Sequence, residues 1–173
     1  METLEAIRTQ RVIRRFRADP LPDDLLRPIL DAGRRAGSSK NLQRWAFIVV
    51  RDRGTLERMA KIGPYAAHLA GAAAGVALVT PRPDGQDDPY SVMWDLGRAA
   101  QNMTLAAWDL GVGSVPATVY EQALCREILG YPADQHCEYV LSFGWPLSAE
   151  DLSRSPKAGG RRELDELLHW ERW

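Results

Sequence analysis

The feature of this sequence that most limits its fold is a long apolar repeat in the middle of the chain. Apolar side chains recur every three or four positions over about five helical turns, at Met93, Leu96, Ala100, Met103, Ala107 and Leu110. This spacing predicts an amphipathic helix, and Gly111 is the residue at which we expect it to stop. Together with a tryptophan-rich C-terminus, the stripe exceeds what a compact monomer of this size needs. It therefore predicts contact with a second chain.

Runs of β-branched and aromatic residues alternate with further helical patterns. Strands are predicted over residues 45–51, 74–80, 114–119 and 138–145, and helices over residues 1–10, 55–62 and 122–129. Asp23 and Asp24 open another helix, but Pro28 lies inside it. A proline past the first turn costs about 3 kcal/mol, so this helix is expected to start late or to bend. The alternation predicts a three-layer α+β or α/β sandwich, and 173 residues suit one domain.

Composition and missing motifs exclude several classes of protein. A formal net charge of −1 gives no general attraction to nucleic acid or to an acidic membrane. The N-terminal stretch has no apolar core typical of a secretory signal, and two cysteines form no disulfide framework, so a cytoplasmic setting is expected. The three histidines lack metal-ligand spacing, and no GxSxG, GxxxxGK[ST] or GxGxxG motif is present. We expect no metal site and no Rossmann-type dinucleotide site.

Two segments carry polar groups that suit a ligand site. Residues 11–17 contain four arginines, which could clamp a phosphate or could form a solvated basic face. Residues 36–45 place glycine, serine, asparagine and glutamine side chains between a helix and a strand, where a ligand or merely a capped loop would fit. Residues 111–114 contain two glycines, for which a helix stop is the simpler interpretation. Lys157, Arg161 and Arg162 could add positive charge to a phosphate site or belong to a surface loop.

Taken in order, these segments resemble the signatures of the nitroreductase family over nearly the whole chain. The segment Gln10-Arg11-Val12-Ile13-Arg14-Arg15-Phe16 is similar to R-R-S-x-R-x-F. The segment from Ala36 to Trp45 is similar to A-P-S-S-x-N-x-Q-P-W, and the helix from Asp95 to Met103 resembles the central dimer helix of the family. The ending His169-Trp170-Glu171-Arg172-Trp173 looks like the tail of many short members.

This resemblance implies a fold, a cofactor and an activity. It implies an α-β-α sandwich with a mainly antiparallel central sheet, forming an intertwined homodimer in which residues 146–173 of a single domain pack on the partner subunit. FMN would bind at the dimer interface, take electrons from NADH or NADPH, and pass them to nitroaromatics, quinones or similar small acceptors in a ping-pong mechanism. The flavin would carry the redox chemistry, and the protein would position it and tune its charge.

Carried over by position, the resemblance also implies the residues of the site. Gln10, Arg11 and Val12 would meet the FMN phosphate and ribityl chain, with Arg161 as a further phosphate ligand. Arg14 would lie near the pyrimidine edge of the flavin and stabilise its reduced form. The remaining contacts would come from Arg35, Ser38, Ser39 and Asn41 of one subunit, and from Val115, Pro116 and Ala117 over the ring.

Several departures from the family pattern bear on cofactor affinity. Gln10 stands where an arginine is expected, Val12 where a serine is expected, and Gly159 where a lysine is expected. The first two changes remove one charge and one hydroxyl from the expected phosphate site, and the third removes a lysine. FMN binding is therefore expected to weaken unless Arg15, Lys157 or Arg162 compensates. Gly37 and Arg44 replace prolines, which loosens the second loop and could bring Arg44 to the substrate mouth. Two alternatives stay open: a flavin-fragmenting or deazaflavin-associated member, and a non-catalytic flavin-binding protein.

Overall fold

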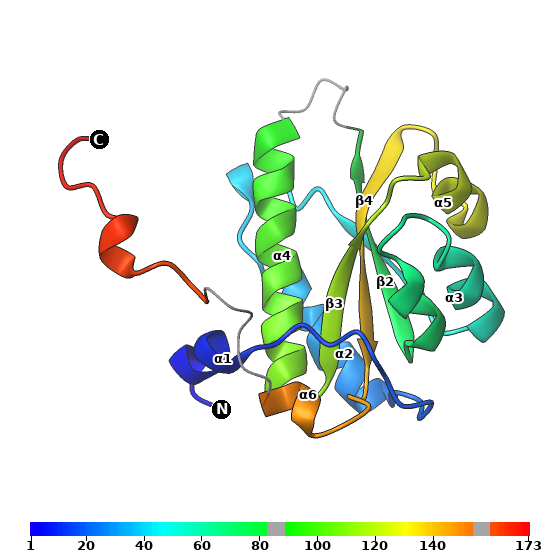
Figure 1. Ribbon diagram of the computed structural model, residues 1–173. Coiled ribbons are helices and arrows are strands. Elements are labelled where there is room, and N and C mark those ends of the chain that lie inside the picture. Colours follow the sequence, from blue (N-terminus) through cyan, green and yellow to red (C-terminus); the bar gives the residue numbers. More distant parts are fainter. Residues whose placement is uncertain (83–88, 154–159) are drawn as a thin grey trace.

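A four-stranded antiparallel sheet forms the centre of the computed structural model, which describes residues 1–82, 89–153 and 160–173 (Figure 1). The strand order is β1-β2-β4-β3, with bounds β1 Ala46–Val50, β2 Ala74–Pro81, β3 Gly113–Thr118 and β4 Gln135–Gly144. The strands predicted from the sequence are all present. The fold is therefore mixed α+β with an antiparallel sheet, as expected.

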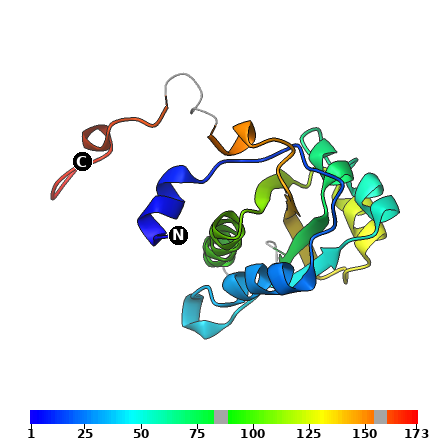
Figure 2. The same ribbon diagram turned by 90° about the horizontal axis from the view of Figure 1, so that it is seen from below.

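Helices cover both faces of this sheet (Figures 1 and 2). One face packs against α2 (Asp23–Arg34) and α4 (Pro89–Asp109), and the other against α3 (Arg53–Met59), η2 (Ala67–Gly71) and α5 (Gln122–Leu129). The short elements are α1 (Thr3–Thr9), η1 (Ser39–Asn41), α6 (Glu150–Ser153) and η3 (Leu164–Glu166). Since β2 lies inside the sheet, its side chains are buried on both faces, with Val76 and Leu78 toward α4 and Ala77 and Val79 toward α5.

The apolar stripe of α4 packs inside its own chain. Leu96, Met103 and Ala107 are buried in one core with Leu78 and Phe143 of the sheet. The expectation that this stripe needs a second chain is therefore wrong, because the α4 side of the sheet already covers it. A different stripe of the same helix is exposed, and it contains Tyr90, Trp94, Gly97, Arg98 and Gln101.

Most helices begin and end near the residues that the sequence predicted. Gly111 and Gly130 both have positive φ, 74° and 70°, and follow the ends of α4 and α5. The helix containing Pro28 does not start late: it begins at Asp23 and continues to Arg34. Burial of Leu26 and Ile29 against the sheet offsets the hydrogen bond that the proline cannot donate.

The N-terminal segment after α1 runs along the exposed edge of β3. Val12 forms a parallel bridge with Ser114, and the N–H of Ile13 donates to the Ser114 carbonyl at 3.0 Å. Ile13 is buried, and a Cβ at Gly113 would lie 2.7 Å from the Ile13 side chain. Glycine at this position therefore lets the basic segment approach the sheet closely.

The C-terminal segment leaves the body of the chain (Figures 1 and 2). Every described residue from Gly160 to Trp173 is exposed, including Leu164, Trp170 and Trp173. Within the tail, His169 stacks on Trp173 with ring centroids 4.2 Å apart. Across the described part of the chain, no helix combines the length and apolar character needed to span a bilayer.

Candidate functional site

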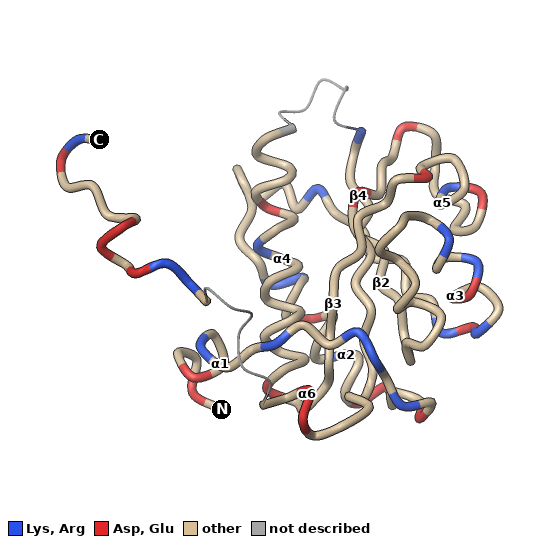
Figure 3. Tube along the Cα trace, viewed as in Figure 1, with Lys and Arg blue, Asp and Glu red and all other residues tan. Residues whose placement is uncertain are grey.

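A hollow of about 320 Å³ lies where the N-terminal segment, α4, β3 and the start of the tail meet; we call it the Arg11 pocket. It is lined by Gln10, Arg11, Val12, Gly97, Ala100, Gln101, Thr104, Ser114, Pro116, Leu141 and Arg161. The structure thus brings together residues from both ends of the chain that the sequence analysis had singled out separately. Both segments carry basic residues (Figure 3).

Backbone carbonyls hold the Arg11 side chain in place. Its Nη1 donates to the carbonyls of Thr9 at 2.8 Å and Gln10 at 3.0 Å, at the C-terminal end of α1. The side-chain oxygen of Gln10 accepts from Gln101 of α4 at 3.1 Å. None of the described side chains that line this pocket is acidic, while two are guanidinium groups. The pocket is therefore suited to an anion such as a phosphate.

A second hollow, of about 480 Å³, adjoins the first at Pro116; we call it the Arg14 pocket. Its lining is Arg14, Pro64, Tyr65, Ala67, His68 and Pro116. His68 is 91% buried, and its Nδ1 lies 2.7 Å from the Oγ of Ser142 on β4. Its Nε2 is buried without a hydrogen-bond partner among the described residues. Because this atom is buried, it is shielded from solvent although its residue lines the pocket.

The surroundings of His68 favour its neutral form. Burial, as the larger cause, and the positive charge of Arg14 together lower the pKa of His68 from 6.5 to about 4, while the Pro116 carbonyl opposes the shift. At neutral pH the Arg14 pocket therefore contains one positive charge and one neutral imidazole. Sequence reasoning missed this residue, because an isolated histidine gives no signal before the fold buries it.

Strand β3 presents only one of its three predicted residues to these pockets. Pro116 is exposed and lines both of them, whereas the side chains of Val115 and Ala117 are each 1% exposed. Neighbouring residues of a strand point to opposite faces, and Ala117 lies in the core beneath α5. Side-chain contact with a ligand in these pockets is therefore possible for Pro116 and not for its two neighbours.

The loop of residues 38–43 lies on another face of α4 (Figure 2). The backbone N–H of Ser39 donates to the buried carboxylate of Asp95 at 2.8 Å, and the Gln43 N–H donates to Ser38 Oγ at 3.0 Å. Asn41 accepts from the Gln43 side chain at 3.1 Å. A hollow of about 500 Å³ beside this loop is lined by Ser38, Ser39, Tyr90, Ser91, Trp94, Asp95 and Arg98.

This loop adopts a backbone conformation that side chains disfavour. Positive φ angles occur at Lys40, Asn41 and Gln43, with values of 51°, 57° and 49°. Such residues persist when neighbouring contacts fix them. The Asp95 carboxylate is one such contact, since it ties the loop to α4.

Removing the Asp95 carboxylate should loosen this loop. We expect Asp95→Ala to lower the free energy of unfolding by about 1–3 kcal/mol, because a charge-assisted hydrogen bond is lost. Hydrogen exchange measured by NMR should show faster exchange at the Ser39 amide. Asp95→Asn, which keeps an acceptor oxygen, should show a smaller change. Unaltered exchange at Ser39 in the alanine variant would contradict this assignment.

Other predicted residues lie away from the Arg11 pocket. Arg35 is exposed and pairs with Asp31 at 2.6 Å, and hydrogen bonds from Arg35 and Arg34 lower the pKa of Asp31. Arg15 does not replace the missing phosphate ligands, because it pairs with the buried carboxylate of Asp151 at 3.0 Å. Arg44 donates to Ser91 Oγ at 2.7 Å.

Two further residues fall outside the described ranges. Lys157, considered as a substitute ligand, and Gly159, which stands in place of a lysine, both belong to residues 154–159.

Comparisons with known proteins agree with this fold. The Nitroreductase family model matches residues 7–73 and 63–145. A provisionally named NADH dehydrogenase/NAD(P)H nitroreductase of Archaeoglobus fulgidus is 35% identical over 178 residues, which covers 99% of each chain. A provisionally named nitroreductase of Desulfovibrio desulfuricans, solved in complex with FMN, has a TM-score of 0.80 and 30% identity, covering 100% of this chain and 99% of that one.

A longer relative extends the comparison. The NADPH:FMN oxidoreductase of Vibrio harveyi, solved with NAD⁺, has a TM-score of 0.83 and 26% identity, covering 99% of this chain and 77% of that one. Fold and relatives together define an oxidoreductase of the nitroreductase type. The chain belongs to the nitroreductase family, as its sequence motifs predicted.

Proposed function

We propose that this protein is an FMN-dependent NAD(P)H oxidoreductase that reduces nitroaromatics, quinones or similar small acceptors by a ping-pong mechanism. The observation that carries the proposal is the meeting of Arg11 and Arg161 with Gln10 and Pro116 around one pocket. FMN, when bound, would supply the transfer of reducing equivalents between nicotinamide and acceptor. The relatives described above are named as NAD(P)H or FMN oxidoreductases, and one was solved with FMN.

The chain's own residues fit the parts of FMN. Arg11 and Arg161 would bind the phosphate, and Pro116 would lie against the ring. Arg14 would donate to the pyrimidine edge, and the His68 side chain lies in the wall of the same pocket. One guanidinium beside a neutral imidazole would favour an anionic ring without adding a second charge.

The predicted contact residues lie in two separate places on the subunit, which favours a homodimer. Ser38, Ser39 and Asn41 lie on a different face of α4 from the Arg11 pocket, and Arg35 lies beyond both pockets. In a symmetric dimer, this loop of one subunit would contact the flavin held by the Arg11 pocket of the other. We propose that each flavin binds between two intertwined α-β-α subunits in this way.

The exposed tail supports the same assembly. Its apolar residues, Leu164, Trp170 and Trp173 among them, contact water in the single chain, which is costly for large aromatic side chains. A hollow of about 710 Å³ between α2 and the β1 edge includes Leu26, Leu30, Trp45 and Phe47 in its wall. Residues 146–153 of the predicted extension contact their own chain instead, through Pro146, Leu147 and Asp151. We infer that the exposed part, residues 160–173, packs on the partner subunit.

A flavin titration tests the proposed activity. Purified protein should bind one FMN per subunit, and NADH or NADPH should bleach the bound flavin anaerobically. Added quinone or nitroaromatic should restore the colour, and initial rates at several acceptor concentrations should give the parallel double-reciprocal lines of a ping-pong enzyme. Failure to bind FMN would refute the proposal. Tight binding without reduction by either nicotinamide would instead indicate a non-catalytic flavin-binding protein.

Deleting residues 164–173 tests the dimer while keeping Arg161. The full chain should sediment as a dimer at micromolar concentration, and the shortened chain should sediment mainly as a monomer because the apolar tail contacts are lost. FMN affinity should fall in parallel, since the second half of each site would be missing. A full-length chain that sediments as a monomer would contradict the interfacial site.

A further inference from the structure

The hollow beside the loop of residues 38–43 has one charged group at its surface; we call this hollow the Arg98 pocket. Its volume is about 500 Å³, and its wall combines polar and aromatic side chains: Ser38, Ser39, Tyr90, Ser91, Trp94, Asp95 and Arg98. Arg98 is exposed, whereas Asp95 is buried and accepts from the Ser39 N–H at 2.8 Å. The charge that this pocket presents to solvent is therefore positive.

A glycine allows the Arg98 guanidinium to lie against the loop. A Cβ added at Gly37 would lie 2.5 Å from Nη2 of Arg98, 3.1 Å from Cζ and 3.2 Å from Nη1, so any larger residue would displace this group. Gly37 and Arg44 both stand where the family signature has a proline, and Arg44 donates to Ser91 in the wall of the same pocket. The Arg98 pocket is therefore a place where this chain departs from the family signature.

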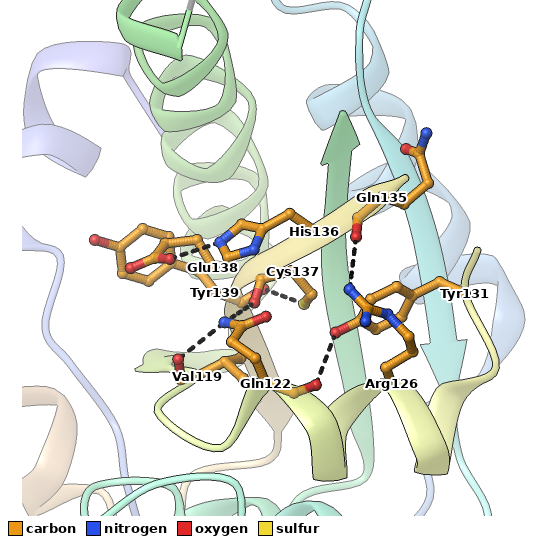
Figure 4. A network of polar contacts seen from close by, with 9 residues as sticks. All are labelled: Val119, Gln122, Arg126, Tyr131, Gln135, His136, Cys137, Glu138 and Tyr139. Carbon is orange, nitrogen blue, oxygen red and sulfur yellow. Dashed lines mark hydrogen bonds and ion pairs between the residues drawn. The ribbon is translucent and has the colours of Figure 1, made fainter. Parts of the chain in front are cut away.

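Arg98 has no partner within the described part of the chain. Arg126 illustrates the contrast: in the polar network of α5 and β4, near the β-bulge at Glu138, it donates to the Gln135 carbonyl at 3.1 Å (Figure 4). Arg98 forms no such hydrogen bond and no ion pair with a described residue. Its five N–H donors are therefore available to an anionic ligand.

Two aromatic rings beside Arg98 suit a nucleotide base. Tyr90, Trp94 and Arg98 follow one another at intervals of four residues on α4, so they share one face of the helix. Both rings are exposed and line the pocket. Bases stack on aromatic side chains of this kind, and a guanidinium binds phosphate oxygens in pairs. The pocket therefore suits an adenine nucleotide that carries a phosphate.

We propose that Arg98 binds the phosphate on the adenosine ribose of NADPH and thereby makes the protein prefer NADPH to NADH. This inference rests on the proposed function and selects between the two reductants that it leaves open. The two dinucleotides differ only in this phosphate, and an arginine is a usual partner for it. The loop in the pocket wall is the segment proposed to contact the flavin of the other subunit, so a dinucleotide at that flavin would extend into the Arg98 pocket.

Calorimetric titration of the FMN-loaded protein with NADP⁺ and NAD⁺ tests this assignment without turnover. NADP⁺ should bind about tenfold or more tightly than NAD⁺. Arg98→Gln should weaken NADP⁺ binding by about 10- to 100-fold and leave NAD⁺ binding unchanged, whereas Arg98→Lys should keep part of the preference. Gly37→Ala should weaken NADP⁺ binding alone, because its Cβ displaces the guanidinium. Trp94→Ala should weaken both dinucleotides equally, since both carry adenine.

A matched control and the contrary outcomes make this test specific. Arg58→Gln removes a guanidinium of α3 that pairs with Glu127, and should change neither affinity. Equal weakening of NADP⁺ and NAD⁺ by Arg98→Gln would overturn the inference, because the charge would then act on the diphosphate that both share. An unchanged NADP⁺ affinity would also overturn it. So would a loss of the dimer in sedimentation, because Arg98 would then belong to the subunit interface.

Failure of the proposed function would look different. Protein that binds no FMN would refute the flavin function and not the role of Arg98. Titration of the FMN-free protein with adenosine 2′,5′-bisphosphate and with 5′-AMP would still decide that role. The bisphosphate should bind more tightly, and Arg98→Gln should remove the difference; an equal affinity of the natural chain for both nucleotides would overturn the inference.

Discussion

Replacing Arg11 by glutamine is expected to weaken FMN binding by about 10- to 100-fold. The change removes one of the two guanidinium groups of the Arg11 pocket, and a hydrogen bond to a charged group contributes about 1.5–3 kcal/mol. Only ligands that carry the phosphate should lose affinity. Riboflavin, which lacks the phosphate, should bind equally to both proteins. Quenching of flavin fluorescence during titration measures both affinities.

Two further substitutions complete this test: one removes a guanidinium outside the pocket as a control, and the other adds a cation to the pocket. Arg58→Gln removes a guanidinium that pairs with Glu127 outside the pocket, and should leave FMN affinity unchanged. Gln10→Arg adds a cation where the family pattern has one, and should tighten FMN binding about tenfold or more. Equal weakening of FMN and riboflavin in Arg11→Gln would show that Arg11 supports the fold of the segment and not the phosphate.

Acidification should destabilise this protein partly through His68. The folded state holds this imidazole neutral with a pKa of about 4, whereas the unfolded chain has the ordinary value of 6.5. Above pH 6.5 neither state takes up the proton, so the full stability is present. As the pH falls toward 4, the unfolded state binds a proton that the folded state rejects, and the free energy of unfolding decreases. The loss attributable to His68 is about 3 kcal/mol between about pH 7.5 and pH 4.

Urea unfolding of His68→Gln measures this contribution. Glutamine can keep a hydrogen bond to Ser142 but carries no proton to titrate. The variant should therefore lose about 3 kcal/mol less stability than the natural chain over the same pH range. Carboxylates titrate in both proteins, so their effect cancels in the difference. Identical pH dependence of the two proteins would show that His68 is not held neutral by its surroundings.

Local patterns in the sequence were sufficient for most elements of the fold. Residues 122–129 were predicted as a helix with those bounds, because apolar spacing and a glycine stop are properties of the segment itself. The physical signal for this helix lies within a few residues along the chain. The phosphate role of Gln10 and Arg11, in contrast, came from the resemblance to a family signature and stays a prediction that the FMN titrations test.

Contacts between distant segments decided the rest. The spacing of Met93 to Leu110 required a covered face, but only the folded sheet showed that Leu78 and Phe143 cover it instead of a second chain. The periodicity of apolar residues specifies which side chains must be buried, but it does not specify the surface against which they pack. Likewise, the burial of His68 and the bulge at Glu138 arise where strands and loops far apart in sequence pair. The sequence by itself therefore determined the elements and the family motif, while the tertiary structure decided how the site is built from them.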